Sequence, residues 1–514
     1  METQVKHEHE QGTPAVRTKV LFCISEALPF AASGGLGEVG GSLPRALYEN
    51  DVNVRVMLPL YATVGQEFRS KMKSLGAMYI DFAQRQEYCG VFELVKDNVT
   101  YYFIDNEKYF KRDNLYGYDD DGERFAFFSK ACLDTFKLTE FKPDIIHAND
   151  WHAATAIIYL KTAYAAAKDF AKIKTLFTIH NIQFQGKYPY SFISNTLCLD
   201  YQYKNLLDYA GELNMVKAAI ECSDMFNTVS PTYAEEIKMP GYAHGLESCI
   251  NNNAHKMAGI LNGINYNYYD PKKDKELFAT FSDKTLENKT LNKRGVQKLF
   301  HMQVDDTIPM LMYNGRLSTQ KGIDLIKDGI DVILSERIQM IIMGNGEKRY
   351  ESFFEHIENK YQGKFKVLRY SGNISKKLYA AADLMLMPSL YEPCGLSQMI
   401  ASRYGTVPIV RETGGLRDSV RDFGCEGGGN GYTFCNYSLH DMLYSVKRGV
   451  TDFVNDGPEW INKMRTVIKK DFSWKNTVKD YVTLYKKMQK KVVQKPVKVE
   501  KNMGEKETRV KKNS

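Results

Sequence analysis

The chain of 514 residues lacks any apolar run of the roughly 20 residues that a membrane-spanning helix needs. Its first residues, METQVKHEHEQGTPAVRTK, are polar throughout and lack the apolar stretch of a secretory signal peptide. We therefore expect neither a membrane partner nor export.

Paired cysteines at metal-binding spacing are also missing. The nine cysteines include no C-x-x-C pair, and their odd number in a long chain favours neither a disulfide framework nor a zinc site. His147 and His152 stand five residues apart, with no third ligand at metal spacing. We expect no metal, no cofactor and a reducing, cytoplasmic location. A plastid would fit a plant source, although no transit peptide is seen.

A basic surface stripe is not implied by the charge, although the formal net charge is +7. Residues 486–514 hold ten Lys and one Arg against three Glu, so the rest of the chain is close to neutral. We therefore expect no nucleic-acid partner. The polar leader 1–18 and the Lys-rich tail 489–514 are predicted to be disordered, and a partner-binding tail is the alternative.

Short apolar strands alternate with helical stretches in two successive series, which is typical of βαβ units and parallel sheets. Strands of the first series are expected at Lys19–Leu28, Val52–Leu58, Val99–Ile104, Asp144–His147 and Thr175–Ile179. Those of the second are expected at Pro309–Tyr313, Gln339–Met343, Phe365–Tyr370, Leu384–Met387 and Pro408–Val410. We predict an α/β protein of two Rossmann-like domains, 19–261 and 262–466. A ligand should bind in the central cleft between the carboxyl ends of their strands.

A glycine turn, Ser33-Gly34-Gly35-Leu36-Gly37, follows the first strand and precedes a helix expected through Leu43–Tyr48, where Pro44 obscures the start. Without Cβ atoms a phosphate can approach the backbone N–H groups, and a helix N-terminus favours an anion. The sequence is not G-x-G-x-x-G, so a tight turn without a ligand remains the alternative.

Two cations, Arg316 and Lys321, follow the first strand of the second series. A guanidinium and an ammonium there could hold a diphosphate across the cleft. As isolated loop residues they could equally be ordinary surface cations.

Three further segments place polar groups at strand ends. Asp150-Trp151 and His180-Asn181 offer a carboxylate for hydroxyls and an indole for a sugar face, or form a polar loop. Glu392 precedes Cys394-Gly395-Leu396, and its carboxylate can accept hydrogen bonds from two neighbouring sugar hydroxyls or cap a helix. Thr413-Gly414-Gly415 is a second candidate phosphate cradle.

These motifs, in this order, resemble the glycogen/starch synthase family of retaining nucleotide-sugar glucosyltransferases, over residues 19–488. The resemblance is carried by GGLGEVGGSLPRAL, DIIHANDWHAA, LFTIHNIQFQG, FNTVSPTYAEEI, NGRLSTQKGID, PSLYEPCGLSQM, VRETGGLRDSV and FSWKNTVKDYVTLY. It implies a GT-B fold in which a last helix, 467–488, crosses back to the N-terminal domain.

The resemblance also implies residue roles. Gly35 would bind the donor phosphate, Arg316 and Lys321 the diphosphate, and Asp150 and His180 the transferred glucose. Glu392 and the N–H groups of Cys394, Gly395 and Leu396 would hold sugar or ribose hydroxyls, and Tyr370 would stack on the base. Three features depart from the family. Ala32-Ser33 replaces Lys-Thr before the glycines, Glu38 replaces Asp, and Tyr268 or Tyr269 lies where Trp is common.

The function implied is transfer of glucose from ADP-glucose, or UDP-glucose, to the non-reducing end of an α-1,4-glucan with retention. Because no nucleophile and acid pair is evident, no covalent intermediate is expected. A glucan-binding regulatory pseudoenzyme and another GT-B sugar transferase are the alternatives.

Overall fold

The computed structural model describes residues 17–490. The predicted disordered leader and tail therefore lie outside the described residues, except for 17–18 and 489–490. Thr18 Oγ1 donates to Gln489 Oε1 at 2.9 Å, so the described chain ends lie side by side.

The N-terminal domain is built on a nine-stranded sheet of order β12-β11-β7-β6-β1-β2-β5-β4-β3. Its strands are β1 (Lys19–Cys23), β2 (Asn53–Pro59), β3 (Lys73–Phe82), β4 (Arg85–Lys96), β5 (Val99–Asp105), β6 (Ile145–Asn149), β7 (Lys174–Ile179), β11 (Met225–Thr228) and β12 (Met257–Gly259). Pairing is parallel from β12 to β5, and β4 and β3 add an antiparallel edge. The strand order reverses beside β1, which creates a crevice at the carboxyl ends of β1 and β6.

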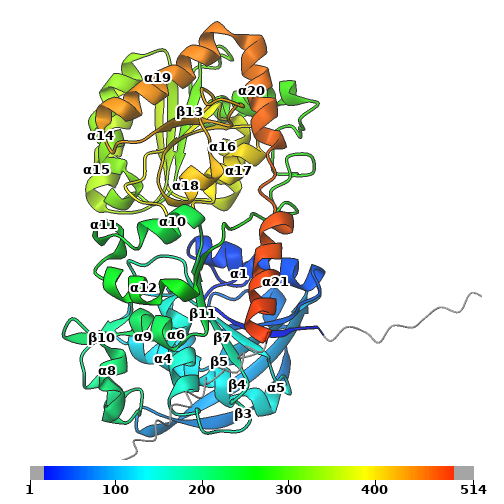
Figure 1. Cartoon of the computed structure of the whole chain (residues 1–514). Helices are drawn as coiled ribbons and strands as arrows, with labels where there is room; N and C mark the ends of the chain where they lie inside the picture. Colours follow the sequence, from blue (N-terminus) through cyan, green and yellow to red (C-terminus); the bar gives the residue numbers. More distant parts are fainter. Residues whose placement is uncertain (1–16, 491–514) are drawn as a thin grey trace, which may run out of the picture.

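The C-terminal domain carries an all-parallel sheet of order β15-β14-β13-β16-β17-β18. Its strands are β13 (Met310–Asn314), β14 (Gln339–Met343), β15 (Phe365–Leu368), β16 (Leu384–Met387), β17 (Val407–Arg411) and β18 (Tyr432–Phe434). The corresponding crevice lies beside β13, and Figure 1 shows the two domains stacked one above the other.

Helices cover both sheets. In the first domain the longer ones are α1 (Gly35–Glu49), α4 (Asp121–Asp134), α6 (Asp150–Lys161) and α9 (Met215–Cys222), with shorter α10 (Pro231–Glu236) and α12 (Glu247–Asn253). In the second they are α13 (Lys289–Leu299), α14 (Ile323–Ser335), α15 (Lys348–Lys360), α16 (Gly372–Ala381), α17 (Ser397–Arg403), α18 (Gly414–Ser419), α19 (Leu439–Asn455) and α20 (Gly457–Lys469).

The last described helix, α21 (Trp474–Gln489), leaves the second domain and packs beside α1 on the first (Figure 1). Its buried side chains recur at helical spacing and join the core of the first domain: Trp474, Val478, Tyr481, Leu484, Tyr485 and Met488. Trp474 Nε1 donates to Ser42 Oγ of α1 at 2.8 Å. The chain thus crosses between the domains a second time near residue 473.

The expected end of the first strand was wrong, because this strand ends at Cys23 instead of Leu28. The helix after the glycine turn, whose start the sequence left open, begins at Gly35 and continues through Pro44. Glycines allow this helix to approach the preceding segment, because a Cβ on Gly40 would lie 2.2 Å from the Glu26 carbonyl oxygen. The antiparallel strands β3 and β4, the parallel strands β11 and β12 and the edge strand β18 were not predicted.

Candidate active site

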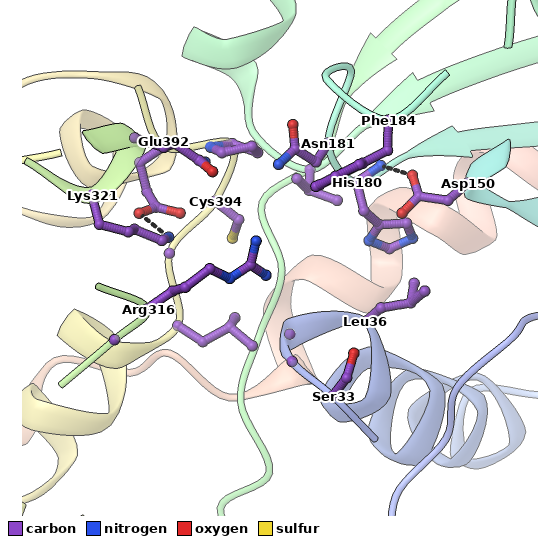
Figure 2. A pocket seen from close by; sticks show the side chains of 18 of the residues that line it. Ser33, Leu36, Asp150, His180, Asn181, Phe184, Arg316, Lys321, Glu392 and Cys394 are labelled. Atoms are coloured by element: carbon purple, nitrogen blue, oxygen red, sulfur yellow. Dashed lines mark hydrogen bonds and ion pairs between the residues drawn. The ribbon is translucent and has the colours of Figure 1, made fainter. Parts of the chain in front are cut away.

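A cleft of about 610 Å³ separates the carboxyl ends of the two sheets. Its walls come from segments that follow β1, β6 and β7 in one domain and β13 and β16 in the other. Figure 2 shows side chains from both domains pointing into it. This is where an open parallel sheet places its ligands.

The glycine turn forms one wall. Gly34 precedes α1 in extended backbone, and a Cβ on it would meet nothing within 4 Å. A Cβ on Gly35 would touch only Leu396 of the opposite domain, at 3.6 Å. Neither position requires glycine for backbone conformation or packing, so both leave room for a ligand close to the backbone N–H groups.

Glu26 anchors this turn. Its carboxylate accepts hydrogen bonds from the backbone N–H of Ser33 at 2.6 Å and from Ser33 Oγ at 2.7 Å. Ser33 is therefore turned toward Glu26, which itself lines the cleft.

Asp150 and His180 come together at the ends of β6 and β7 (Figure 2). The backbone N–H of His180 donates to Asp150 Oδ1 at 2.7 Å. His180 Nε2 lies 3.0 Å from Asn149 Oδ1, and Asn149 Nδ2 donates to the Cys23 carbonyl. Since the amide orients its oxygen toward the ring, we assign the Nε2–H tautomer to His180.

Burial shifts the pKa values of both the Asp150 and the His180 side chains. Desolvation raises the pKa of Asp150 to about 7, although N–H groups of His180 and Asn181 partly offset it. Desolvation also lowers the pKa of His180 to about 3, so the imidazole is neutral near pH 7. Asp150 has left-handed backbone (φ 56°), a conformation that Asp tolerates better than most residues.

The two predicted cations have different surroundings in the opposite wall. Lys321 Nζ pairs with Glu392 Oε2 at 2.5 Å (Figure 2). Ser389 Oγ donates to the same oxygen at 3.1 Å. Arg316 is exposed and forms no ion pair with residues 17–490. Its guanidinium extends into the space between the domains in Figure 2.

The segment after Glu392 presents backbone to the cleft. Gly395 has left-handed backbone (φ 70°), and a Cβ there would lie 2.6 Å from Gln398 Oε1, so glycine is required. Burial raises the pKa of the Cys394 thiol to about 12, which keeps it neutral. Cys394, Gly395 and Leu396 all line the cleft, as do Trp151 and Asn181.

Some predicted site residues lie outside this lining. Tyr370 follows β15 and is 60% exposed. Glu38 accepts a hydrogen bond from the Tyr269 hydroxyl, and burial raises its pKa. Thr413, Gly414 and Gly415 are buried, and the carboxylate of Glu236 already binds Thr413 Oγ1 and the Gly414 N–H. The prediction of a second phosphate cradle at this segment is therefore wrong, because the Glu236 carboxylate of the N-terminal domain already binds its hydrogen-bond donors.

Several residues that line the cleft were not predicted from the sequence. Glu26, Tyr116, Asp121, Phe184 and Gln320 all line the cleft. Phe184 and Gln320 lie inside the motifs LFTIHNIQFQG and NGRLSTQKGID, so their positions could have been singled out. Tyr116 and Asp121 precede and begin α4, where no local pattern indicates a site.

Two structural findings concern only the part of the chain that the structure describes. No three His, Cys, Asp or Glu side chains there could together hold a metal ion. None of its helices is long and apolar enough to cross a membrane.

Two Rossmann-like domains that face each other across such a cleft define a glycosyltransferase of the GT-B class. Matches to known protein families show to which family within this class the chain belongs. Residues 19–252 match the starch synthase catalytic domain, and residues 299–466 match the glycosyl transferases group 1. The chain belongs to the glycogen/starch synthase family and is an enzyme of the hexosyltransferase class.

Individual relatives agree with this assignment. A glycogen synthase of Geobacillus thermodenitrificans is 42% identical over 477 residues, covering 92% of this chain and 98% of the relative. The catalytic domain of starch synthase IV from Arabidopsis thaliana, bound to ADP and acarbose, is 31% identical with a TM-score of 0.86, covering 92% and 99% of the two chains. Sucrose-phosphate synthase from Thermosynechococcus elongatus, 16% identical with a TM-score of 0.59 over the same shares, resembles it in fold alone.

Proposed function

We propose that this chain transfers glucose from ADP-glucose to the non-reducing end of an α-1,4-glucan, with retention of configuration. Binding of ADP and acarbose to the related Arabidopsis starch synthase supports a nucleotide donor and a glucan acceptor. The observation that carries the proposal is the pairing of an open glycine turn with Arg316 and Lys321 across one cleft.

The donor diphosphate would bridge the two domains. The N–H groups of Gly34, Gly35 and Leu36 would bind it on one side, and Arg316 and Lys321 on the other. Tyr370 would stack on the adenine, in keeping with its exposed position after β15.

The glucose would lie between Asp150 and Glu392. Asp150, with Trp151, His180 and Asn181, would bind it from the N-terminal domain. Glu392 and the N–H groups of Cys394, Gly395 and Leu396 would bind its remaining hydroxyls. Catalysis would then come from aligning the acceptor and stabilising charge on the leaving diphosphate.

The reaction would proceed on one face of the sugar. The bond from the anomeric carbon to the diphosphate oxygen breaks as a glucan hydroxyl oxygen bonds to the same carbon. The hydroxyl proton passes to the departing phosphate oxygen. Retention would follow without a covalent enzyme intermediate, and Arg316 and Lys321 would balance the developing charge.

The experiment is incubation of the full chain with labelled ADP-glucose and glycogen, followed by digestion of the product with β-amylase. We expect labelled maltose, because β-amylase cleaves only α-1,4 linkages, from the non-reducing ends of a glucan. Label that is incorporated but resists digestion would contradict retention or the proposed linkage. Glycogen binding without incorporation would favour a regulatory pseudoenzyme.

A further inference from the structure

Two short helices, α10 of the first domain and α18 of the second, pack against each other where the domains meet (Figure 1). Asp418 of α18 accepts hydrogen bonds from Ser230 Oγ (2.6 Å), Thr232 N–H (3.0 Å) and Thr232 Oγ1 (2.6 Å) at the start of α10. Glu236, the last residue of α10, binds the start of α18 in return. We call these reciprocal contacts the α10–α18 clasp.

The two halves of the clasp differ in burial. Asp418 is exposed, whereas Glu236 is 8% exposed and Thr413 is fully buried. Glu236 Oε1 accepts from Thr413 Oγ1 at 2.9 Å and from the Gly414 N–H at 3.0 Å. A buried carboxylate that lost these donors would be costly to keep, so this half is the more tightly specified.

The residues that Glu236 binds lie directly against the backbone of the Glu392–Leu396 segment. The Gly415 N–H donates to the Glu392 carbonyl at 3.1 Å. A Cβ on Gly414 would lie 1.9 Å from that carbonyl oxygen, and one on Gly415 would lie 2.1 Å from the Cys394 carbonyl oxygen. Gly414 also has left-handed backbone (φ 43°), so both its backbone conformation and its close approach to the Glu392 carbonyl require glycine.

A continuous path therefore runs from one domain into the sugar side of the site. It passes from Glu236 through Gly414 and Gly415 to the Glu392 backbone, whose side chain binds Lys321. Asp418 also lies on α18, but its own hydrogen-bond partners belong to α10, so its removal leaves the bonds from Thr413 and Gly414 to Glu236 in place.

We propose that Glu236 is a positioning residue, which holds the Glu392–Leu396 segment in the geometry that binds the donor's glucose. This inference rests on the proposed function and names one residue beyond the site already assigned. Glu236 itself is not among the residues that line the cleft. It also makes the position of a sugar-binding segment in one domain depend on a side chain of the other.

The test compares Glu236→Ala with Asp418→Ala, which breaks the other half of the same clasp. ADP and ADP-glucose binding are measured by calorimetry without a glucan, and steady-state rates are measured with glycogen. Because Arg316 and Lys321 would bind the diphosphate and the Glu392 segment the sugar, Glu236→Ala should weaken ADP-glucose binding roughly tenfold and ADP binding far less. Asp418→Ala should leave the ratio of the two affinities as in the wild type.

Two further variants keep the test decisive if Glu236→Ala does not fold. Glu236→Gln retains an acceptor oxygen and should restore most of the ADP-glucose affinity. Thr413→Val removes one donor at similar volume and should show the Glu236→Ala pattern more weakly. Equal effects of Glu236→Ala and Asp418→Ala, or Thr413→Val binding both ligands as the wild type does, would overturn the inference alone. A wild type that binds neither ligand would overturn the proposed function with it.

Discussion

At the scale of single residues, the two cations of the cleft are not equivalent. Arg316 is exposed and has no ion pair within residues 17–490, whereas Lys321 neutralises Glu392, whose side chain is only 5% exposed. Replacing Lys321 with a neutral residue would therefore leave the buried Glu392 carboxylate without its counter-ion and destabilise the fold. Replacing Arg316 breaks no ion pair among the described residues, so its effect on the rate can be separated from an effect on stability.

For Arg316→Ala we expect kcat to fall by roughly 10²–10³-fold, the loss typical of one electrostatic stabiliser, with an unchanged unfolding temperature. Lys321→Ala should lower both kcat and the unfolding temperature. The measurements are steady-state rates with varied donor and thermal unfolding. An unchanged kcat with only a raised donor KM for Arg316→Ala would assign it to ground-state binding.

We expect the activity to depend on pH near neutrality, because burial raises the pKa of Asp150 to about 7. If its ionised form binds the sugar, kcat/KM for the donor should rise with pH and level off above about 7. His180 titrates far below this range. The carboxyl ionises near 3.8 when unfolded, so its contribution to stability should fall as pH rises from about 4 to about 7.

The control for this profile is Asp150→Asn, whose residual activity should lose the inflection near neutrality. The measurement is kcat/KM at donor concentrations far below KM, across the range on both sides of neutrality. A wild-type profile that stays flat through this range would contradict the role given to the Asp150 carboxylate.

At the scale of elements, the turn before α1 would offer the donor backbone N–H groups but no cation of its own. Ala32 stands where the family has Lys, and a Cβ on Gly37 would lie 2.4 Å from the Ala32 Cβ, so this side chain points toward α1. Glu26 is close by, since the same Cβ would lie 3.2 Å from its Oε2.

Ala32→Lys should lower the donor KM only a few-fold, because Glu26 would compete with the diphosphate for the new ammonium. Ala32→Met, of similar length and without charge, is the matched control. The measurement is donor KM with ADP-glucose and UDP-glucose. Equal or weaker donor binding in Ala32→Lys than in Ala32→Met would show that the pocket excludes a cation there.

Continuous apolar runs that are buried on both faces could be predicted from the sequence, whereas exposed strands and buried strands interrupted by polar residues could not. β11 and β18 are largely buried, but both contain polar residues that break the apolar run. β14 and β16 are continuous apolar runs in the middle of a sheet, and their bounds agree with the prediction. β3 is largely exposed at the sheet edge, so its alternation is weak and the pattern does not mark it.

The same distinction applies to the site. Asp150, His180, Arg316 and Glu392 follow predicted strands, so topology alone brings them to one cleft. Glu236 and Thr413 meet across 177 residues of sequence. Such a long-range contact leaves no local signal, which is why the cradle at Thr413–Gly415 was misassigned.

At the scale of the whole molecule, the groups proposed to bind the donor are divided between two domains. One would supply backbone N–H groups and Asp150, and the other would supply the cations and Glu392, all of which line the cleft. The chain crosses between them twice, near 263 and 473, and the two crossings touch: the Ile264 N–H donates to the Phe472 carbonyl at 2.9 Å. Donor binding should therefore depend on how the domains approach each other.

The most direct test of the account is the initial rate of glucose incorporation into glycogen with ADP-glucose and with UDP-glucose at equal, subsaturating concentration. We expect incorporation from both to require Arg316 and to be faster from ADP-glucose. Faster incorporation from UDP-glucose would contradict the donor assignment, and no incorporation from either would contradict glucosyl transfer by this cleft.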